Sequence, residues 1–226
     1  MKKETIISII NNDIKYQSSL NLLLKSAAYN SNKLLENDWY ILYAEGTDIK
    51  IDFKKYNPNL HLLEVSVKET DDVYALKFAI INFIEMYGDS NHILTYLDTD
   101  HIVLQELVLP QVDCDTIFFS SEKNTTFIEK LGLVTDYNSS FIRADIPTWK
   151  KVIYGWRKWY EKLAVKDVGR FREEVAMSCA VQEAGITIKM VPPKIQSNFQ
   201  SFDKNCALFH YGGEYPIAKS LKKLFY

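Results

Sequence analysis

Two carboxylates stand two residues apart, directly after an apolar segment. Asp98 and Asp100 follow the run 92–97 (HILTYL), which has the composition of a buried strand. In extended backbone, residues i and i+2 point to the same side, so both carboxylates can reach one ion. Two carboxylates that close together repel each other unless a cation lies between them, and their oxygens favour Mg²⁺ or Mn²⁺. The pair predicts a divalent-metal site, and acidic residues that only cap a turn are the alternative.

A histidine and two glycines form a second polar group near the other end of the sequence. His210, Tyr211, Gly212 and Gly213 follow the apolar run 207–209. A histidine at the end of a strand can bind a metal ion, and adjacent glycines let the backbone approach a phosphate closely. Taken alone, the segment better fits a turn with a surface histidine.

The segments that would position these residues alternate between strand and helix patterns. Compact apolar runs that suit buried strands occupy residues 5–10, 39–44, 60–67 and 92–97. Helical spacing of apolar residues occupies 17–29 and 73–86, and the second stretch follows the capping residues 70–72 and ends before Gly88. This alternation predicts an α/β domain with a mainly parallel central sheet. In such sheets ligands bind at the carboxyl ends of the strands, which is where Asp98 and Asp100 fall.

The second half of the chain is less regular. We expect short strands at 116–120 and 140–143, helices from Pro147 through Trp159 and at 172–184, and a last strand at 186–191. No repeat and no Gly/Ser/Pro-rich linker divides the sequence. The prediction is one domain over residues 1–226, with a Rossmann-like nucleotide-binding half over about 1–110 and an irregular half over about 111–226.

Composition limits the classes of protein to which the chain can belong. Its 226 residues include 27 basic and 29 acidic ones, so the formal net charge is −2 and a dedicated nucleic-acid binder is not expected. The cysteines at 114, 179 and 206 are scattered, which fits a reducing compartment and a cytoplasmic protein. The apolar run 6–10 is too short for a signal peptide or a membrane span. At most peripheral membrane contact is expected, through lysines of the tail 218–226, where a solvated helix is favoured.

In this order along the chain, the motifs resemble those of a known group of enzymes. The α/β front half, the strand with Asp98-x-Asp100 and the segment His210-x-x-Gly213 resemble a nucleotide-sugar glycosyltransferase of the GT-A fold. The nearest pattern is that of the glycogenin-like and bacterial lipopolysaccharide hexosyltransferases. Residues 137–142 (YNSSFI) are similar to that group's Phe-Asn-Ser/Ala-Gly-aliphatic segment, and 173–178 (EEVAMS) stand in the place of its Asp-Gln-x-x-Leu-Asn helix start. The group's later lysine has its counterpart in Lys219, three places late.

The resemblance implies a role for each matched residue. It implies that Mn²⁺ or Mg²⁺ is held on the donor diphosphate by Asp98, Asp100 and His210, with Gly213 and Lys219 beside the diphosphate. Asn11 and Asn12 would approach the nucleotide, and Asn138 and Ser139 would contact the donor sugar. Glu173 or Glu174 would face the reacting carbon or the acceptor hydroxyl. The implied donor is a UDP-sugar, the implied acceptor is a glycan or a lipid-linked sugar, and retention of configuration is favoured over inversion.

Two other functions fit parts of the pattern. A phosphatase of the haloacid-dehalogenase type also places Asp-x-Asp after a strand, but that fold normally begins with this strand, whereas three strand patterns precede it here. A catalytically silent module that binds sugars or nucleotides is the other alternative. Such a module is favoured by Ser140, which stands where the group has glycine, and by the late position of Lys219. The presence of Asp98, Asp100 and His210 argues against it.

Three tryptophans and one serine of the second half each allow a functional and a structural interpretation. Trp149, Trp156 and Trp159 fit a platform for an acceptor sugar, but the seven-residue spacing of the first two favours one buried helix face. Ser120 follows a short strand and either borders the site or belongs to a plain polar loop.

Overall fold

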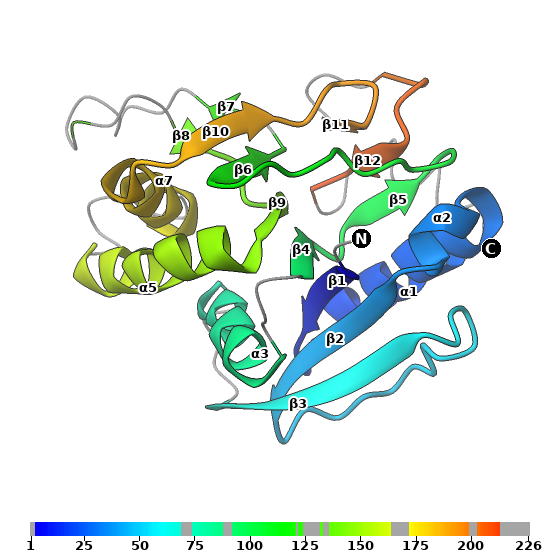
Figure 1. The fold of residues 1–226 in the computed structure, drawn as a ribbon. Coiled ribbons are helices and arrows are strands. Elements are labelled where there is room, and N and C mark those ends of the chain that lie inside the picture. Colours follow the sequence, from blue (N-terminus) through cyan, green and yellow to red (C-terminus); the bar gives the residue numbers. More distant parts are fainter. Residues whose placement is uncertain are drawn as a thin grey trace.

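The central feature of the computed structural model is a sheet with helices on both faces (Figure 1). The structure describes residues 3–68, 74–87, 92–120, 122–123, 132, 136–163, 172–198 and 203–212. Within these ranges the largest sheet has seven strands in the order β10-β6-β9-β4-β1-β2-β3. Their bounds are β1 Lys3–Ile10, β2 Asp38–Glu45, β3 Leu60–Lys68, β4 His92–Leu97, β6 Thr116–Phe119, β9 Phe141–Asp145 and β10 Thr187–Met190.

The strand directions confirm the predicted α/β class. Strands β3, β2, β1 and β4 run parallel to one another, and β10 runs parallel to β6. Strand β9 is antiparallel to both of its neighbours, β4 and β6. The sheet is therefore mainly parallel, and the carboxyl ends of β1 and β4 lie at the same edge.

Both faces of the sheet are covered because its inner strands are apolar on both sides. Ile6 and Ile41 belong to one buried cluster, whereas their neighbours Ile7 and Leu42 belong to the other. Successive strand residues point to opposite faces, so a continuous apolar run needs a helical layer on each side. The helices α1 (Ile14–Asn30) and α2 (Asn32–Leu35) cover one face, and α3 (Ala79–Tyr87), α5 (Ile146–Lys162) and α7 (Arg172–Ala184) cover the other (Figure 1).

The ends of these helices follow from local chemistry. Asp13 caps α1, since its side chain accepts a hydrogen bond from the backbone of Lys15, and Asp145 caps α5 in the same way. Helix α7 has the predicted bounds and is followed by Gly185 at a φ of +61°, a conformation that favours glycine. The helix expected at 73–86 begins instead as a 3-10 turn, η1 (Ala75–Phe78), before α3. Its expected capping residues 70–72 and Gly88 lie outside the described residues.

Two of the three tryptophans of α5 belong to the core. Trp149 and Trp156 are fully buried, and their indole nitrogens donate to the backbone oxygens of Leu94, at 3.0 Å, and Glu173, at 3.1 Å. A side chain in this position cannot stack on a sugar, so the core interpretation of these two residues holds. The second bond also ties α5 to the first turn of α7.

A small sheet that the sequence did not predict lies beside the end of β4. It consists of β11 (Gln196–Asn198), β12 (Leu208–His210) and β5 (His101–Val103), in that order. Strand β12 pairs antiparallel with β5, which places His210 opposite His101. Two further short strands, β7 (Glu122–Lys123) and β8 (Asp136–Tyr137), pair with each other.

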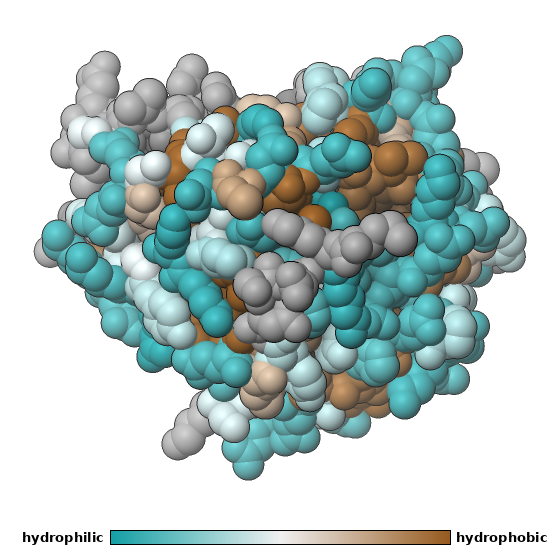
Figure 2. Space-filling model, viewed as in Figure 1, coloured by the Kyte–Doolittle hydropathy of each residue, from teal (hydrophilic) through white to brown (hydrophobic). Residues whose placement is uncertain are grey.

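The surface is mostly polar on the side drawn in Figure 2, where hydrophobic side chains gather in small separate patches. Exposed large apolar residues include Ile14, Met86, Val108 and Tyr154, which stand on different elements. Among the described helices, none has the length and the apolar character needed to cross a membrane.

Candidate active site

Asp98, Asp100 and His210 come together at the carboxyl end of β4. The Nε2 atom of His210 lies 3.2 Å from Oδ1 of Asp100, and one ligand atom from each of the three residues lies within 4.8 Å of the others. Backbone hydrogen bonds hold the loop, because the nitrogen of Asp98 donates to the oxygen of Ser140 and the nitrogen of Tyr211 donates to the oxygen of Asp100. The structure thus assembles the three residues that the sequence suggested as a metal-binding set.

The groups of this triad change one another's pKa. Asp100 stays ionised and can bind a cation, whereas His210 holds a proton more strongly than a free imidazole does. Burial raises the pKa of Asp100, but His210, His101 and a backbone hydrogen bond together lower it by more, to well below its usual range. Burial lowers the pKa of His210, but the carboxylates of Asp100 and Asp98 together raise it by more. Two carboxylates and one imidazole form a donor set that suits Mn²⁺ or Mg²⁺, and a bound ion would take the place of the histidine's proton.

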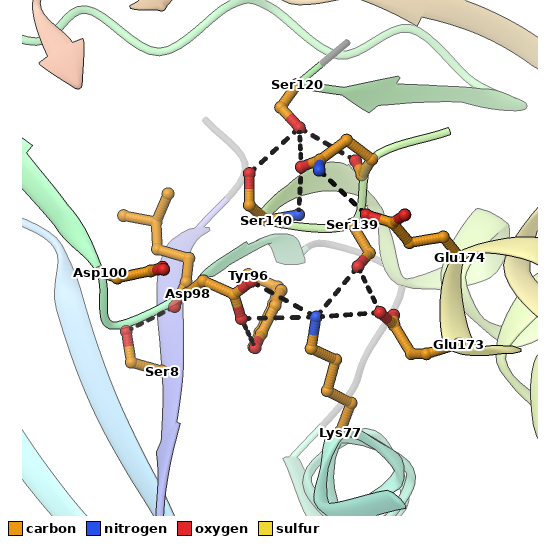
Figure 3. A network of polar contacts seen from close by, with 12 residues as sticks. Ser8, Lys77, Tyr96, Asp98, Asp100, Ser120, Ser139, Ser140, Glu173 and Glu174 are labelled. Carbon is orange, nitrogen blue, oxygen red and sulfur yellow. Dashed lines mark hydrogen bonds and ion pairs between the residues drawn. The ribbon is translucent and has the colours of Figure 1, made fainter. Parts of the chain in front are cut away.

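A buried lysine that the sequence analysis missed lies next to the triad. Figure 3 shows Lys77 extending from its helix to a point between Asp98 and Glu173. Its Nζ atom is 3.4 Å from a carboxylate oxygen of each, and 2.9 Å from the hydroxyl of Ser139. Burial lowers the pKa of Lys77, but the carboxylates of Asp98, Glu173 and Glu174 together raise it by more, so the side chain is a cation at neutral pH. The only sequence signal was a lysine within the apolar stretch AxxFAxxNFIxM of the predicted helix.

Glu173 and Glu174 begin α7 and have different surroundings. Glu173 is only 2% exposed, and its Oε2 atom accepts a hydrogen bond from the Ser139 hydroxyl at 2.8 Å. Burial raises the pKa of Glu173 to about 7, although Lys77 opposes the shift. Its second oxygen has no hydrogen-bond partner within the described residues. Glu174 is half-buried, and its Oε1 atom accepts from the amide of Asn138 at 3.0 Å.

The turn between β8 and β9 connects these glutamates to the small strand β6. The Oδ1 atom of Asn138 accepts hydrogen bonds from the backbone of Ser140, at 3.0 Å, and from the Ser120 hydroxyl, at 2.6 Å. The predicted sugar contacts Asn138 and Ser139 therefore stand in one polar network with Glu173, Lys77 and Asp98 (Figure 3).

The other predicted nucleotide contacts lie at the end of β1. Asn11 and Asn12 serve the local fold there: Oδ1 of Asn11 accepts from the backbone of Asp13 at 3.1 Å, and Oδ1 of Asn12 accepts from that of Asp48 at 2.6 Å. Tyr16, which the sequence analysis did not single out, follows in α1. Its pKa is raised by burial, and to a smaller extent by Tyr74 and by the carboxylates of Asp98, Asp100 and Asp13. Gly213 and Lys219 lie outside the described residues.

A small pocket of about 100 Å³ lies beside the triad and is lined in part by His210. Its polar lining consists of Ser120, Asn138, Gln196, Ser197, Asn198 and His210. Because His210 borders the pocket and Asn138 is bonded to Glu174, the pocket adjoins the site.

Comparison with solved structures supports the fold, whereas comparisons of the sequence find no match. No family model matches the sequence, and no curated protein matches it. A solved structure that does match is the apo form of mouse xyloside xylosyltransferase 1, with a TM-score of 0.60 and 9% identity, over 95% of this chain and 99% of that one. At this identity the likeness is one of fold, and it confirms the GT-A-like α/β architecture predicted from the motif order. It gives no support to the narrower placement within the glycogenin-like group.

Proposed function

We propose that the protein is a metal-dependent glycosyltransferase. It would move a sugar from a nucleoside diphosphate donor, with a UDP-sugar as the first candidate, to a hydroxyl of a glycan or of a lipid-linked sugar. The observation that carries the proposal is the convergence of Asp98, Asp100 and His210 at the carboxyl end of β4, in a fold like that of a xylosyltransferase. Ligands of open α/β sheets bind at this edge.

The proposed chemistry begins with the donor diphosphate. Asp98, Asp100 and His210 would hold Mn²⁺ or Mg²⁺. A divalent ion bound there supplies positive charge against the negative charge that builds up on the leaving diphosphate. Lys77 supports this arrangement because its ammonium group fixes the Asp98 carboxylate at 3.4 Å. The turn at Asn11 and Asn12 would contact the nucleotide, and the half-buried Tyr16 follows this turn in α1.

Glu173 and Glu174 would have different roles next to the donor sugar. Glu173 is buried and bonded to Ser139, which suits a residue that positions Lys77 and Ser139. Glu174 is the more accessible of the two, so it is the better candidate for contact with the reacting carbon or the acceptor hydroxyl. We expect retention of configuration, with the acceptor's proton passing to the leaving phosphate on the same face of the sugar. Inversion would instead require Glu174 to take that proton from the opposite face.

The first test is thermal unfolding with uridine, guanosine, cytidine and adenosine diphosphates, each with and without Mn²⁺. A ligand that binds only the folded state adds about 2.7 kcal/mol of stability at a hundred times its Kd. We expect one diphosphate to stabilise the protein only when Mn²⁺ is present, and Asp100→Ala to abolish the effect. Asp113→Ala is the matched control, since that carboxylate is exposed and pairs with Lys189.

The outcomes separate the proposal from its alternatives. Stabilisation by no diphosphate in either condition would contradict the metal–diphosphate site. Stabilisation without any turnover of the matching nucleotide-sugar, with or without sugar acceptors, would favour a catalytically silent binding module. The topology argues against the phosphatase alternative, because β4 is the fourth strand along the chain and antiparallel β9 separates it from β6.

A further inference from the structure

A hydroxyl group at the end of β6 contacts the turn that carries Asn138. Ser120 directly follows the last residue of β6 and is half-buried. Its Oγ atom lies 2.6 Å from Oδ1 and 3.0 Å from the backbone oxygen of Asn138. The same Oγ atom accepts a hydrogen bond from the Ser140 hydroxyl at 3.1 Å (Figure 3). A serine hydroxyl has one proton, and both acceptors within its reach belong to Asn138.

The orientation of the Asn138 amide is fixed by a backbone donor. The backbone nitrogen of Ser140 lies 3.0 Å from one side-chain atom of Asn138, and a backbone N–H can only donate, so that atom is the amide oxygen. The other atom is then the NH₂ group, and it lies 3.0 Å from Oε1 of Glu174. The amide therefore presents its oxygen to the two serines and its nitrogen to the glutamate.

Glu174 is less enclosed by the protein than the glutamate beside it. Its side chain rotates about three bonds and is only half-buried. Glu173, in contrast, is 2% exposed and is held by Ser139 and Lys77. Hydrogen bonds to carboxylates are stronger than those between neutral groups. The amide of Asn138 can therefore select one position of the Glu174 carboxylate.

The contacts form one chain of hydrogen bonds in which each side chain donates to the next. The Ser140 hydroxyl donates to Ser120, and Ser120 donates to Asn138. Asn138 then donates to Glu174. Bonds in such a chain polarise and strengthen one another. Without the Ser120 hydroxyl, the Asn138 oxygen loses one of its two donors, and the amide is held less firmly against the glutamate.

The chain of hydrogen bonds ends at the glutamate and not at the proposed metal ligands. Within the described part of the protein, the side chains of Ser120 and Asn138 bond to each other, to Ser140 and to Glu174. Neither side chain bonds to the three residues of the metal-binding set there. Removal of the Ser120 hydroxyl should therefore act on Glu174 and leave the binding of a metal–diphosphate pair intact.

We propose that Ser120 is a positioning residue, whose hydroxyl orients the amide of Asn138 so that this amide holds the Glu174 carboxylate in place beside the sugar. The proposal rests on the proposed glycosyltransferase function, in which Glu174 contacts the reacting carbon or the acceptor hydroxyl. Because Ser120 acts through Glu174, its contribution to the reaction disappears when Glu174 is replaced.

The test compares Ser120→Ala, Glu174→Ala and the double variant with the wild type. Ser120→Thr keeps the hydroxyl and is the conservative variant. Ser31→Ala is the matched control, because Ser31 is also a hydrogen-bonded serine but caps α2, on the other face of the sheet from Glu174. Thermal unfolding shows whether each variant folds. If Ser120→Ala does not fold, Ser120→Cys replaces it, since a thiol is a weak donor.

Kinetics with Mn²⁺ give kcat and KM for UDP-glucose, UDP-galactose, UDP-xylose and UDP-N-acetylglucosamine, with water or methyl glycosides as acceptors. Calorimetry gives the Kd of UDP. Loss of one neutral hydrogen bond corresponds to a change of up to about tenfold, so we expect Ser120→Ala to lower kcat about fivefold to tenfold with the Kd of UDP unchanged. Ser120→Thr should keep the wild-type kcat.

The double variant decides whether Ser120 acts through the glutamate. In the Glu174→Ala background, Ser120→Ala should cause no further loss of kcat. The same factor of loss in both backgrounds would overturn the proposal, because Ser120 would then act through another group. An unchanged kcat in Ser120→Ala, or an equal loss of kcat in Ser31→Ala, would also overturn it.

A failure of the proposed function has a different signature. If the wild type neither binds UDP nor turns over a UDP-sugar in the presence of Mn²⁺, that function is contradicted. The positioning of Glu174 is then tested by NMR of the Asn138 side-chain amide, whose signals are assigned by their absence in Asn138→Asp. Amide signals that move in Ser120→Ala toward their positions in Glu174→Ala, but not in Ser31→Ala, support the positioning. Signals that Ser120→Ala leaves unchanged overturn it.

Discussion

Replacing Glu173 by Gln should change the way in which stability depends on pH. Burial raises the pKa of this carboxyl from about 4.5 to about 7. Between these values the folded protein keeps a proton that the unfolded chain has released. The protonated carboxyl therefore stabilises the fold relative to the ionised one, and this contribution is fully present below about pH 4.5 and is lost as the pH rises through about 7. A glutamine has the same shape and loses no proton, so the variant lacks this dependence.

The expected magnitude follows from the two pKa values. A difference of about 2.5 pH units at 1.36 kcal/mol per unit corresponds to about 3 kcal/mol. Only 2% of Glu173 is exposed, so water screens its charge little. Between about pH 4.5 and about pH 8, the free energy of unfolding of the wild type should fall by about 3 kcal/mol relative to that of Glu173→Gln.

Urea unfolding at a series of pH values in that range measures both proteins. A chelator in the buffer keeps stray metal ions from Asp98 and Asp100, because the charge of Asp98 also acts on Glu173. Glu161→Gln controls for the loss of one negative charge, because its side chain is 63% exposed. A difference between the wild type and Glu173→Gln that stays constant across the range would refute the reasoning.

Three further substitutions test contacts that stabilise the fold. Lys77→Met leaves two carboxylates without their shared cation, so the free energy of unfolding in urea should fall by about 3–5 kcal/mol; an unchanged midpoint would contradict the pairing. Arg143→Met removes a bidentate ion pair with Glu4 and hydrogen bonds to Thr95 and Pro110, and chemical denaturation should register a loss of at least about 1.5–3 kcal/mol; in a Glu4→Gln background the part due to the ion pair should disappear, so an equal loss in both backgrounds would contradict the pairing. A Cβ atom at Gly155 would lie 3.3 Å from that of Ala180, so Gly155→Leu should push α5 from α7 and lower the melting temperature, at a cost of about 1–3 kcal/mol; an equal or higher melting temperature would show that this contact has room.

Local sequence patterns determined most of the elements of the fold. The apolar run of β4 has its predicted bounds, and α7 begins and ends as expected, because hydrophobic periodicity and Gly185 are read from neighbouring residues. The position of Asp98 and Asp100 at a sheet edge also followed, since a residue directly after a parallel strand must lie there. The pairing with His210 came from the resemblance, not from any local pattern.

Tertiary structure alone decided which polar groups surround these carboxylates. Lys77 bonds to Ser139 across 62 positions of the chain, and Gln196 bonds to His101 across 95. No periodicity links residues so far apart, because a strand's apolar pattern records that it is buried but not which strand lies beside it. The small sheet of β5, β12 and β11 and the antiparallel insertion of β9 arise from such pairings, and they bring the lysine, the glutamates and the pocket to the end of β4. Burial also changed the pKa of Glu173, which depends on the helices that exclude water from this carboxyl. Two adjacent glutamates in a sequence do not specify that burial.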